Sequence, residues 1–238
     1  MLWNQSRIYQ SHYQTAKGVN PLRILSEFKL LLNNTEILQL LISNKARNKP
    51  LKKIPDSLLN EIVVLKEEAH ELIAPVAVYD YFDSQQLKPK FLFNKSEHTL
   101  LAVCTIGQSL ENESEVLMKN NSLSKCVILD AIASHATEVL AEQLNQYLSK
   151  EIKEKFEGKY YSNRFSPGYC QWTIEEGQKT IFKLLPVGKI GVQLTKSYMM
   201  VPRKSISFAI NIGTEIDKWL GKRECETCDI TECSHRRI

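Results

Sequence analysis

The longest periodic run of apolar residues in this sequence lies between Ser124 and Phe156 and predicts one long helix. The apolar residues near one face of this helix are Val127, Ala131, Val139, Leu140, Leu144, Leu148 and Ile152. A helix with one apolar face has to bury that face against other elements of the fold. The neighbouring segments therefore decide the fold class.

Short segments rich in β-branched and aromatic residues predict strands. We expect strands at 76–82, 90–93, 99–106, 190–194 and 205–212. Further helices are predicted at 107–120 and 173–185, with a short one at 215–220, while 158–170 is expected to be irregular. This mixture predicts an α+β fold in which helices flank an antiparallel β-sheet.

The first part of the chain, residues 1–74, is predicted to be a helical N-terminal extension. Asn20 followed by Pro21 is typical of a helix start, and the apolar residues up to Leu31 continue that pattern. Helices are also expected at 35–43 and at 56–74, where Pro75 ends the second one. A basic linker, 45–55, separates these two helices.

The composition indicates a folded protein. The 238 residues are 43% hydrophobic and 24% charged, which is enough apolar material for a core. The formal net charge of +4 does not indicate a nucleic-acid partner, and no apolar run approaches the ~20 residues of a membrane helix. The first residues lack the basic start and apolar stretch of a secretory signal. We therefore expect a cytoplasmic protein that binds neither nucleic acid nor membrane.

The six cysteines are unevenly spread along the chain. Cys104 and Cys126 lie among apolar residues, where a thiol is usually a small buried hydrophobe. The other four have polar or loop-like surroundings. In a reducing compartment, four cysteines in such surroundings favour a metal or redox role over structural disulfides. They are Cys170, Cys225, Cys228 and Cys233.

The C-terminal segment, 222–238, is a candidate metal-binding tail. Cys225, Cys228 and Cys233 have spacings that allow three thiols to face one metal, and zinc and iron–sulfur sites alike are commonly held by four cysteines. His235 is one candidate fourth ligand and would make a Cys3His zinc site. The pattern leaves an iron–sulfur cluster, zinc, or free thiols open.

The segment from Arg164 to Trp172 reads Arg-Phe-Ser-Pro-Gly-Tyr-Cys-Gln-Trp. Its Pro-Gly pair predicts a tight turn at which a ligand can approach the backbone, and the forked guanidinium of Arg164 suits a carboxylate. Tyr169 adds a flat ring with a polar tip. This set suits an amino-acid-bearing ligand with an aromatic base, although the residues alone favour an ordinary Pro-Gly turn before a helix, because such loops are common.

The order of motifs resembles the activation domain of cobalamin-dependent methionine synthase. Arg-x-x-Pro-Gly-Tyr at 164–169 is followed by a helix, by Ile-Gly-Val-Gln-Leu-Thr-Lys-Ser at 190–197, by Met-x-Pro at 200–202 and by Lys-Ser-Ile-Ser at 204–207. The resemblance covers roughly 74–213 and includes 129–132 and 137–142 of the long helix. It is closer to stand-alone members of this family found in corrinoid methyl-transfer systems. We therefore expect residues 75–221 to form an activation-domain-like unit.

This resemblance implies a fold that binds S-adenosylmethionine, built on a twisted antiparallel sheet with flanking helices. It also implies docking on a cobalamin-binding module or corrinoid protein whose cobalt centre is reduced and then methylated by S-adenosylmethionine. Arg164 would hold the methionine carboxylate, and Ser166, Gly168 and Tyr169 would contact the ligand. Glu138 would face the same site, and Tyr169 would also lie close to the corrin.

The resemblance also bears on the cysteines. Stand-alone relatives tend to pair a Gly-Tyr-Cys loop with a Cys-x2-Cys tail, which makes Cys170 the preferred fourth ligand beside Cys225, Cys228 and Cys233. An iron–sulfur cluster held there would lie beside the expected corrin surface and could relay an electron. A zinc ion would instead fix the tail across the loop.

Two departures from the family pattern support an alternative. Lys196 replaces a glutamate of the methionine synthase domain, and two of that domain's ligand-contacting segments have no match here. The alternative is a metal-stabilised docking subunit of a corrinoid protein that lacks S-adenosylmethionine chemistry. A zinc-ribbon-like nucleic-acid binder is a third reading, which rests on the tail alone.

Overall fold

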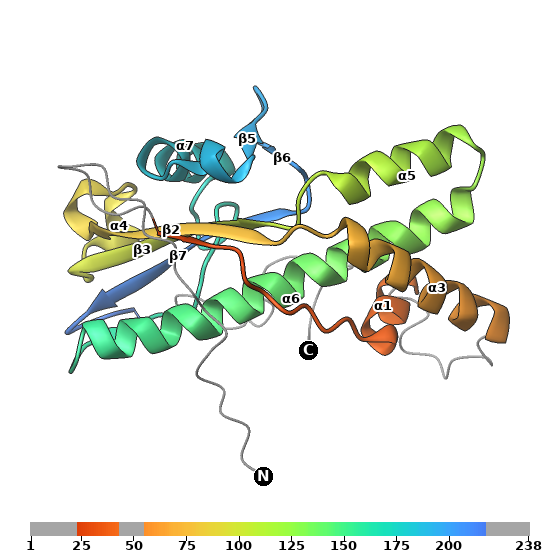
Figure 1. Cartoon of the computed structure of the whole chain (residues 1–238). Coiled ribbons are helices and arrows are strands. Elements are labelled where there is room, and N and C mark those ends of the chain that lie inside the picture. Colours follow the sequence, from red (N-terminus) through yellow and green to blue (C-terminus); the bar gives the residue numbers. More distant parts are fainter. Residues whose placement is uncertain (1–22, 43–54, 218–238) are drawn as a thin grey trace, which may run out of the picture.

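The centre of the protein is a five-stranded antiparallel sheet in the order β1-β2-β3-β7-β4 (Figure 1). The computed structural model describes residues 23–42 and 55–217. The strands are β1 (Arg23–Leu25), β2 (Val76–Asp83), β3 (His98–Thr105), β7 (Ser205–Gly213) and β4 (Tyr160–Tyr161). This sheet and its flanking helices confirm the predicted α+β fold.

Strand β3 is the central strand and is paired along its whole length on both sides. Its last seven residues are all buried, because helices and loops cover both faces of the sheet at this position. The strand therefore shows a continuous apolar run instead of the alternation of a half-exposed strand.

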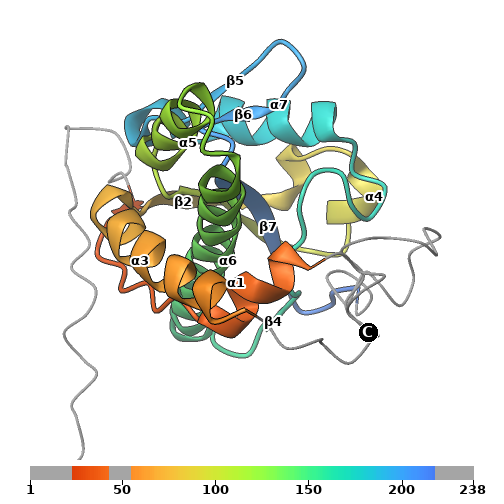
Figure 2. The same ribbon diagram turned by 90° about the vertical axis from the view of Figure 1, so that its right-hand side faces the viewer.

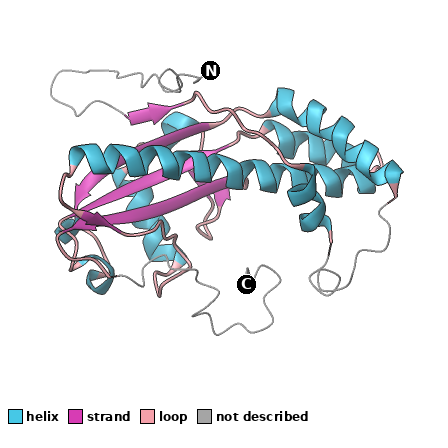
Figure 3. Cartoon of the chain, turned by 90° about the horizontal axis from the view of Figure 1, so that it is seen from below, coloured by secondary structure: helices cyan, strands magenta, loops and turns pink. Residues whose placement is uncertain are grey.

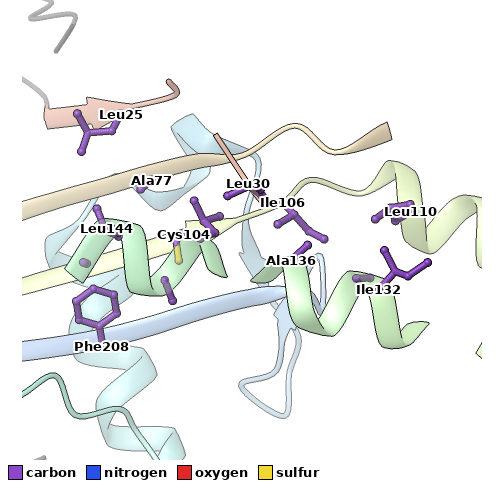
Figure 4. Packing of buried hydrophobic residues seen from close by; sticks show 14 of the residues in the cluster. Leu25, Leu30, Ala77, Cys104, Ile106, Leu110, Ile132, Ala136, Leu144 and Phe208 are labelled. Atoms are coloured by element: carbon purple, nitrogen blue, oxygen red, sulfur yellow. The ribbon is translucent and has the colours of Figure 1, made fainter. Parts of the chain in front are cut away.

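One face of the sheet is covered by α6 (Leu123–Lys155), which runs under the strands (Figures 1 and 3). Three shorter helices pack around its N-terminal half: α1 (Asn34–Leu41), α3 (Asp56–Leu72) and α5 (Ser109–Lys119). Residues of β1, α1, α3, α6 and the sheet share one buried apolar cluster. Figure 4 shows part of this cluster, with Cys104 and Phe208 of the sheet facing the same core as Ala136 and Leu144.

The opposite face carries α7 (Ile174–Leu184), the short helix α4 (Lys90–Phe93) and the hairpin of β5 (Gln193–Leu194) and β6 (Met200–Val201) (Figure 1). Two short 3-10 helices, η1 (Ser84–Gln86) and η2 (Val187–Ile190), belong to this layer. Its apolar side chains, among them Phe93, Phe165, Trp172 and Ile181, form a second buried cluster. The sheet therefore separates two cores.

The predicted helix from Pro21 to Leu31 is wrong for the part that the structure describes. Arg23–Leu25 forms β1, and residues 26–33 contain no helix. Pairing with β2 satisfies the backbone of this segment, and Arg23 forms a salt bridge of 2.7 Å with Glu151 of α6. Tertiary contacts therefore override the local apolar pattern. The predicted helices at 35–43 and 56–74 are confirmed as α1 and α3.

The predicted strand at 90–93 is also wrong, because these residues form α4. Pro89 accepts a hydrogen bond from the backbone of Leu92, and Leu92 and Phe93 turn together into the second core. Of the predicted strand at 190–194 only Gln193–Leu194 is extended, since Gly191 at φ +74° ends a 3-10 helix there. Residues 215–217 are not helical, and the remainder of that predicted helix lies outside the described residues.

Of the linker predicted at 45–55, only residue 55 is described. The cysteine-rich tail at 222–238 lies entirely outside the described residues. The domain boundaries at 74/75 and 221/222 stay a prediction. No helix in the described ranges is long and apolar enough to cross a membrane.

Candidate functional site

The segment from Ser162 to Trp172 forms a loop at the outer edge of β7. Phe165 and Ala209 exchange two backbone hydrogen bonds of 3.0 and 2.8 Å, which fix the start of the loop to the strand. Beyond this bridge, no described strand pairs with the outer edge of β7 from Ser205 to Phe208. The loop therefore leaves the sheet beside a stretch of strand edge that pairs with no other described strand.

The loop winds tightly between Ser166 and Trp172. The backbone N–H of Tyr169 donates to the carbonyl of Ser166 at 3.1 Å, and the N–H of Trp172 donates to the carbonyl of Tyr169 at 2.8 Å. The N–H of Gly168 donates back to the carbonyl of Trp172. Gly168 has φ +95°, a conformation that a residue without a Cβ adopts readily.

Two contacts hold this loop against α7 and the second core. The ring of Trp172 is fully buried, with its centroid 5.5 Å from that of Phe93 and 5.7 Å from that of Phe165. Pro167 lies directly against Gly177 of α7, where an added Cβ would be 2.6 Å from two atoms of the proline ring. Glycine at position 177 is therefore what lets the loop lie this close to the helix.

Arg164, at the start of the loop, meets Glu138 of α6. Its Nη2 lies 3.4 Å from Oε2 of Glu138, and its guanidinium carbon lies 5.8 Å from the centroid of Phe208. Ion pairs of full strength have N–O distances of ~2.7–2.9 Å, so this contact is loose. The side chains are 26% and 48% exposed, respectively. Both charged groups therefore retain hydrogen-bonding capacity toward solvent or a ligand.

Arg164 and Phe165 point to opposite sides of the sheet, as successive residues of an extended segment do. Arg164 lies over Phe208 on the α6 side, and Phe165 is buried in the second core. Cys104 lies on the α6 side as well, and burial raises the pKa of its thiol to about 12. Cys104 is fully buried, which confirms the prediction of a core thiol. Cys126 is half-buried, and its Sγ contacts the carbonyl of Ser114 at 3.5 Å.

The far end of the loop presents an exposed apolar surface. Tyr169 is 54% exposed and Ile174, at the start of α7, is 46% exposed. Tyr169 follows Gly168 in the loop, and a Cβ added at Gly168 would be 3.2 Å from Cγ1 of Ile174. Large exposed apolar side chains grouped on one part of a fold are typical of a contact surface.

The comparison with known families agrees with this architecture. The family model described as "Vitamin B12 dependent methionine synthase, activation domain" matches residues 64–219, about two thirds of the chain. The chain belongs to this activation-domain family. Its fold is also similar to the solved structure titled "Crystal Structure of the MetH Reactivation Domain bound to AdoHcy". The TM-score is 0.55 at 14% identity, over 91% of this chain and 85% of that chain.

The activation-domain fold brings Arg164 and Glu138 together and places Ser166, Gly168 and Tyr169 in one loop beside them. Ser166 is half-buried and Gly168 is exposed. Lys196 is exposed in the turn of the β5–β6 hairpin. This hairpin packs against α7, where Nζ of Lys179 lies 4.9 Å from the centroid of Tyr198.

The predicted metal ligands fall on both sides of the described boundary. Cys170 is half-buried against the second core, one residue from Tyr169. Cys225, Cys228, Cys233 and the alternative His235 lie outside the described residues. Within 23–42 and 55–217, no three His, Cys, Asp or Glu side chains are grouped to hold a metal.

Two residues near this site, Phe208 and Gly177, were not predicted from the sequence. Phe208 lies under the guanidinium of Arg164, and nothing in the strand pattern distinguishes it from other core residues. Gly177 seats Pro167, and a glycine inside a helical pattern is a signal that could have been used. His135, on α6 before Glu138, serves the packing of the chain: its Nε2 accepts a hydrogen bond of 3.1 Å from the backbone N–H of Asn33.

Proposed function

We propose that this protein binds S-adenosylmethionine and supports the reductive reactivation of a cobalamin- or corrinoid-dependent methyltransferase in the cytoplasm. The observation that carries the proposal is the solvent-accessible pair of Arg164 and Glu138 beside the Arg-x-x-Pro-Gly-Tyr loop. When bound, S-adenosylmethionine supplies an electrophilic methyl group for the reduced cobalt of the partner's cofactor. The part of this chain is to bind and orient.

The charges of the pair match the amino-acid end of the ligand. Arg164 presents a forked donor to a carboxylate, and Glu138, 3.4 Å away, presents acceptors to an ammonium group. A zwitterion that inserts between two loosely paired charges exchanges one weak ion pair for two stronger ones. The Phe208 ring under the guanidinium limits where Arg164 can move.

The remainder of the ligand would follow the loop and the outer edge of β7. The backbone near Gly168 is exposed, and Ser205–Phe208 has no described strand on its outer side. Tyr169 offers its exposed ring to a flat group. The relation to the reactivation domain solved with AdoHcy supports a ligand of this class.

The partner would be a cobalamin-binding module or corrinoid protein. Membership of the activation-domain family supports this class of partner. Tyr169 and Ile174 provide an apolar surface next to the proposed ligand site, where the corrin has to come close to the methyl donor. Docking there would exclude water from the reacting groups.

The proposal includes a metal site in which Cys170 joins Cys225, Cys228 and Cys233, with an iron–sulfur cluster or zinc as the metal. Metal and sulfide content of the full chain, purified without oxygen, tests this site. We expect Cys170→Ser to lose most of the metal and Cys126→Ser to keep it. Full occupancy in Cys170→Ser would refute the shared site.

A docking subunit without S-adenosylmethionine chemistry is the second candidate. The reversed charge at Lys196 favours it. Calorimetric titration of S-adenosylmethionine into the full chain separates the two functions. Saturable binding is the result that the first proposal requires, whereas absence of binding heat at several temperatures leaves the docking subunit.

A further inference from the structure

A cleft of about 280 Å³ lies between α3 and α5, with α6 as its floor. Figure 2 views the molecule from this end, where the three helices come together. The apolar part of the lining includes Leu72 of α3, Leu117 of α5 and Leu129 of α6. No residue of the loop at 162–172 lines this cleft.

The rim of the cleft is acidic. Glu68 and Glu71 of α3 and Glu113 of α5 line it, and none of the three forms an ion pair with another described residue. Helix α3 carries five carboxylates and one lysine, and α5 carries three carboxylates and one lysine. The two helices therefore bear a formal charge of −6 in a chain whose net charge is +4.

Exposed apolar side chains extend the lining along both helices. Val64 is 54% exposed and lies one turn before Glu68, and Val116, next to Leu117, is 46% exposed. Exposed apolar surface that continues from a cleft and has a polar rim marks an interaction site. The cleft is smaller than the ~300–1,000 Å³ typical of small-molecule sites, which favours single side chains of a protein partner as its occupants.

We propose that this cleft docks a basic amphipathic helix of a partner protein. An antiparallel or crossing helix in the groove would bury apolar residues at i, i+3 or i+4, and i+7 between Leu72 and Leu117. Lysine or arginine residues on its flanks would face Glu68, Glu71 and Glu113. Leu129 and Glu138 are nine residues apart on α6, or about 14 Å along the helix. At about 100° per residue the two also lie on opposite sides of α6, so the docked helix would not cover the proposed ligand site.

A designed peptide tests the proposal on the full chain. The probe is a fluorescent helix of about 18 residues, or five turns, with leucine at every i, i+3, i+4 and i+7 position and lysine or arginine on its flanks. Binding is measured by anisotropy at ~0.15 M salt, where charges further apart than ~8 Å are screened. The test variant is Glu68→Lys with Glu113→Lys. We expect it to weaken binding at least about tenfold relative to the wild type.

The matched control is Glu67→Lys with Glu115→Lys, which changes the net charge equally on the same two helices. Both residues are exposed and absent from the cleft lining, and Glu115 lies about 200° around α5 from Glu113. We expect the control to bind the probe as the wild type does.

Three results would overturn the proposal. Equal weakening in both variants would mean general charge attraction, and no binding by the wild type would mean that the cleft does not accept a helix. A wild type that dimerises in sedimentation while Glu68→Lys with Glu113→Lys stays monomeric would assign the cleft to a second copy of this chain. Titration of S-adenosylmethionine is independent of all three results, so failure here leaves the proposed function standing.

Discussion

Replacing Gly177 by alanine tests whether this position seats the Arg-x-x-Pro-Gly-Tyr loop. Inside an ordinary helix this change stabilises, because alanine has a helix propensity ~1 kcal/mol better than glycine. In this protein the new methyl group would lie 2.6 Å from Cβ and Cγ of Pro167 and 3.0 Å from Cε2 of Trp172. The structure therefore predicts the opposite sign.

The magnitude follows from the size of this clash. Carbon atoms in contact lie ~3.5–4.0 Å apart, so the proline ring would have to move by about 1 Å. Overpacking of this kind costs ~1–3 kcal/mol, and both neighbours are rigid rings in a buried layer. After subtraction of the ~1 kcal/mol gain in helix propensity, we expect a net loss of up to about 2 kcal/mol in the free energy of unfolding.

Urea unfolding followed by circular dichroism measures this difference. The control is Gly188→Ala, because Gly188 is exposed and an added Cβ there would meet nothing within 4 Å. The control should match the wild type or gain up to ~1 kcal/mol. If Gly177→Ala is as stable as Gly188→Ala, the loop is not held in the way described.

Two further predictions concern residues outside the loop. Glu151→Gln should lower the free energy of unfolding by about 2–3 kcal/mol in urea titrations, because Glu151 accepts hydrogen bonds from Tyr79 and Arg23 in a partly buried cluster; an unchanged midpoint would contradict this. Burial lowers the pKa of His135 below its usual 6.5, and its unprotonated Nε2 accepts a hydrogen bond from the backbone of Asn33. The unfolded chain therefore binds a proton at His135 more readily than the folded chain does. Stability should therefore fall as pH drops through about 6.5, and the same scan on His135→Gln should be flatter if the assignment is right.

The sequence predicted the elements whose pattern matches their final surroundings. Strands β2, β3 and β7 are rich in β-branched and aromatic residues, and most of the predicted apolar face of α6 is buried, with Val127 as an exposed exception. Local preference and tertiary packing agree in these segments, so pattern alone was sufficient.

The failures occur where distant contacts decide the conformation. The apolar residues from Pro21 to Leu31 have the spacing of a helix. Arg23–Leu25 instead forms a strand, because β2 supplies backbone hydrogen-bond partners and Glu151 pairs with Arg23. Lys90–Phe93 contains strand-forming residues, but it forms a helical turn whose Leu92 and Phe93 are buried in the second core, where Phe93 contacts the distant Phe165 and Trp172. Neither set of contacts can be predicted from a short window of sequence.

The candidate site was predicted in outline. The motif identified the loop and the resemblance added Glu138, which lies 26 residues before Arg164 on another element. What spacing could not provide is the geometry: the loose 3.4 Å contact, the Phe208 ring beneath it and the glycine that seats the loop. These features depend on contacts between α6, β7, the loop and α7, which are distant in the sequence.

Calorimetric titration of S-adenosylmethionine into Arg164→Ala tests the central claim most directly. The guanidinium is proposed to hold the ligand's carboxylate, and a hydrogen bond to a charged group contributes ~1.5–3 kcal/mol, so affinity should fall at least about tenfold. The control is Arg203→Ala, an equally charged change at a residue 68% exposed and paired with Glu111. We expect the control to bind as the wild type does. Equal affinity of Arg164→Ala and the wild type would contradict the account.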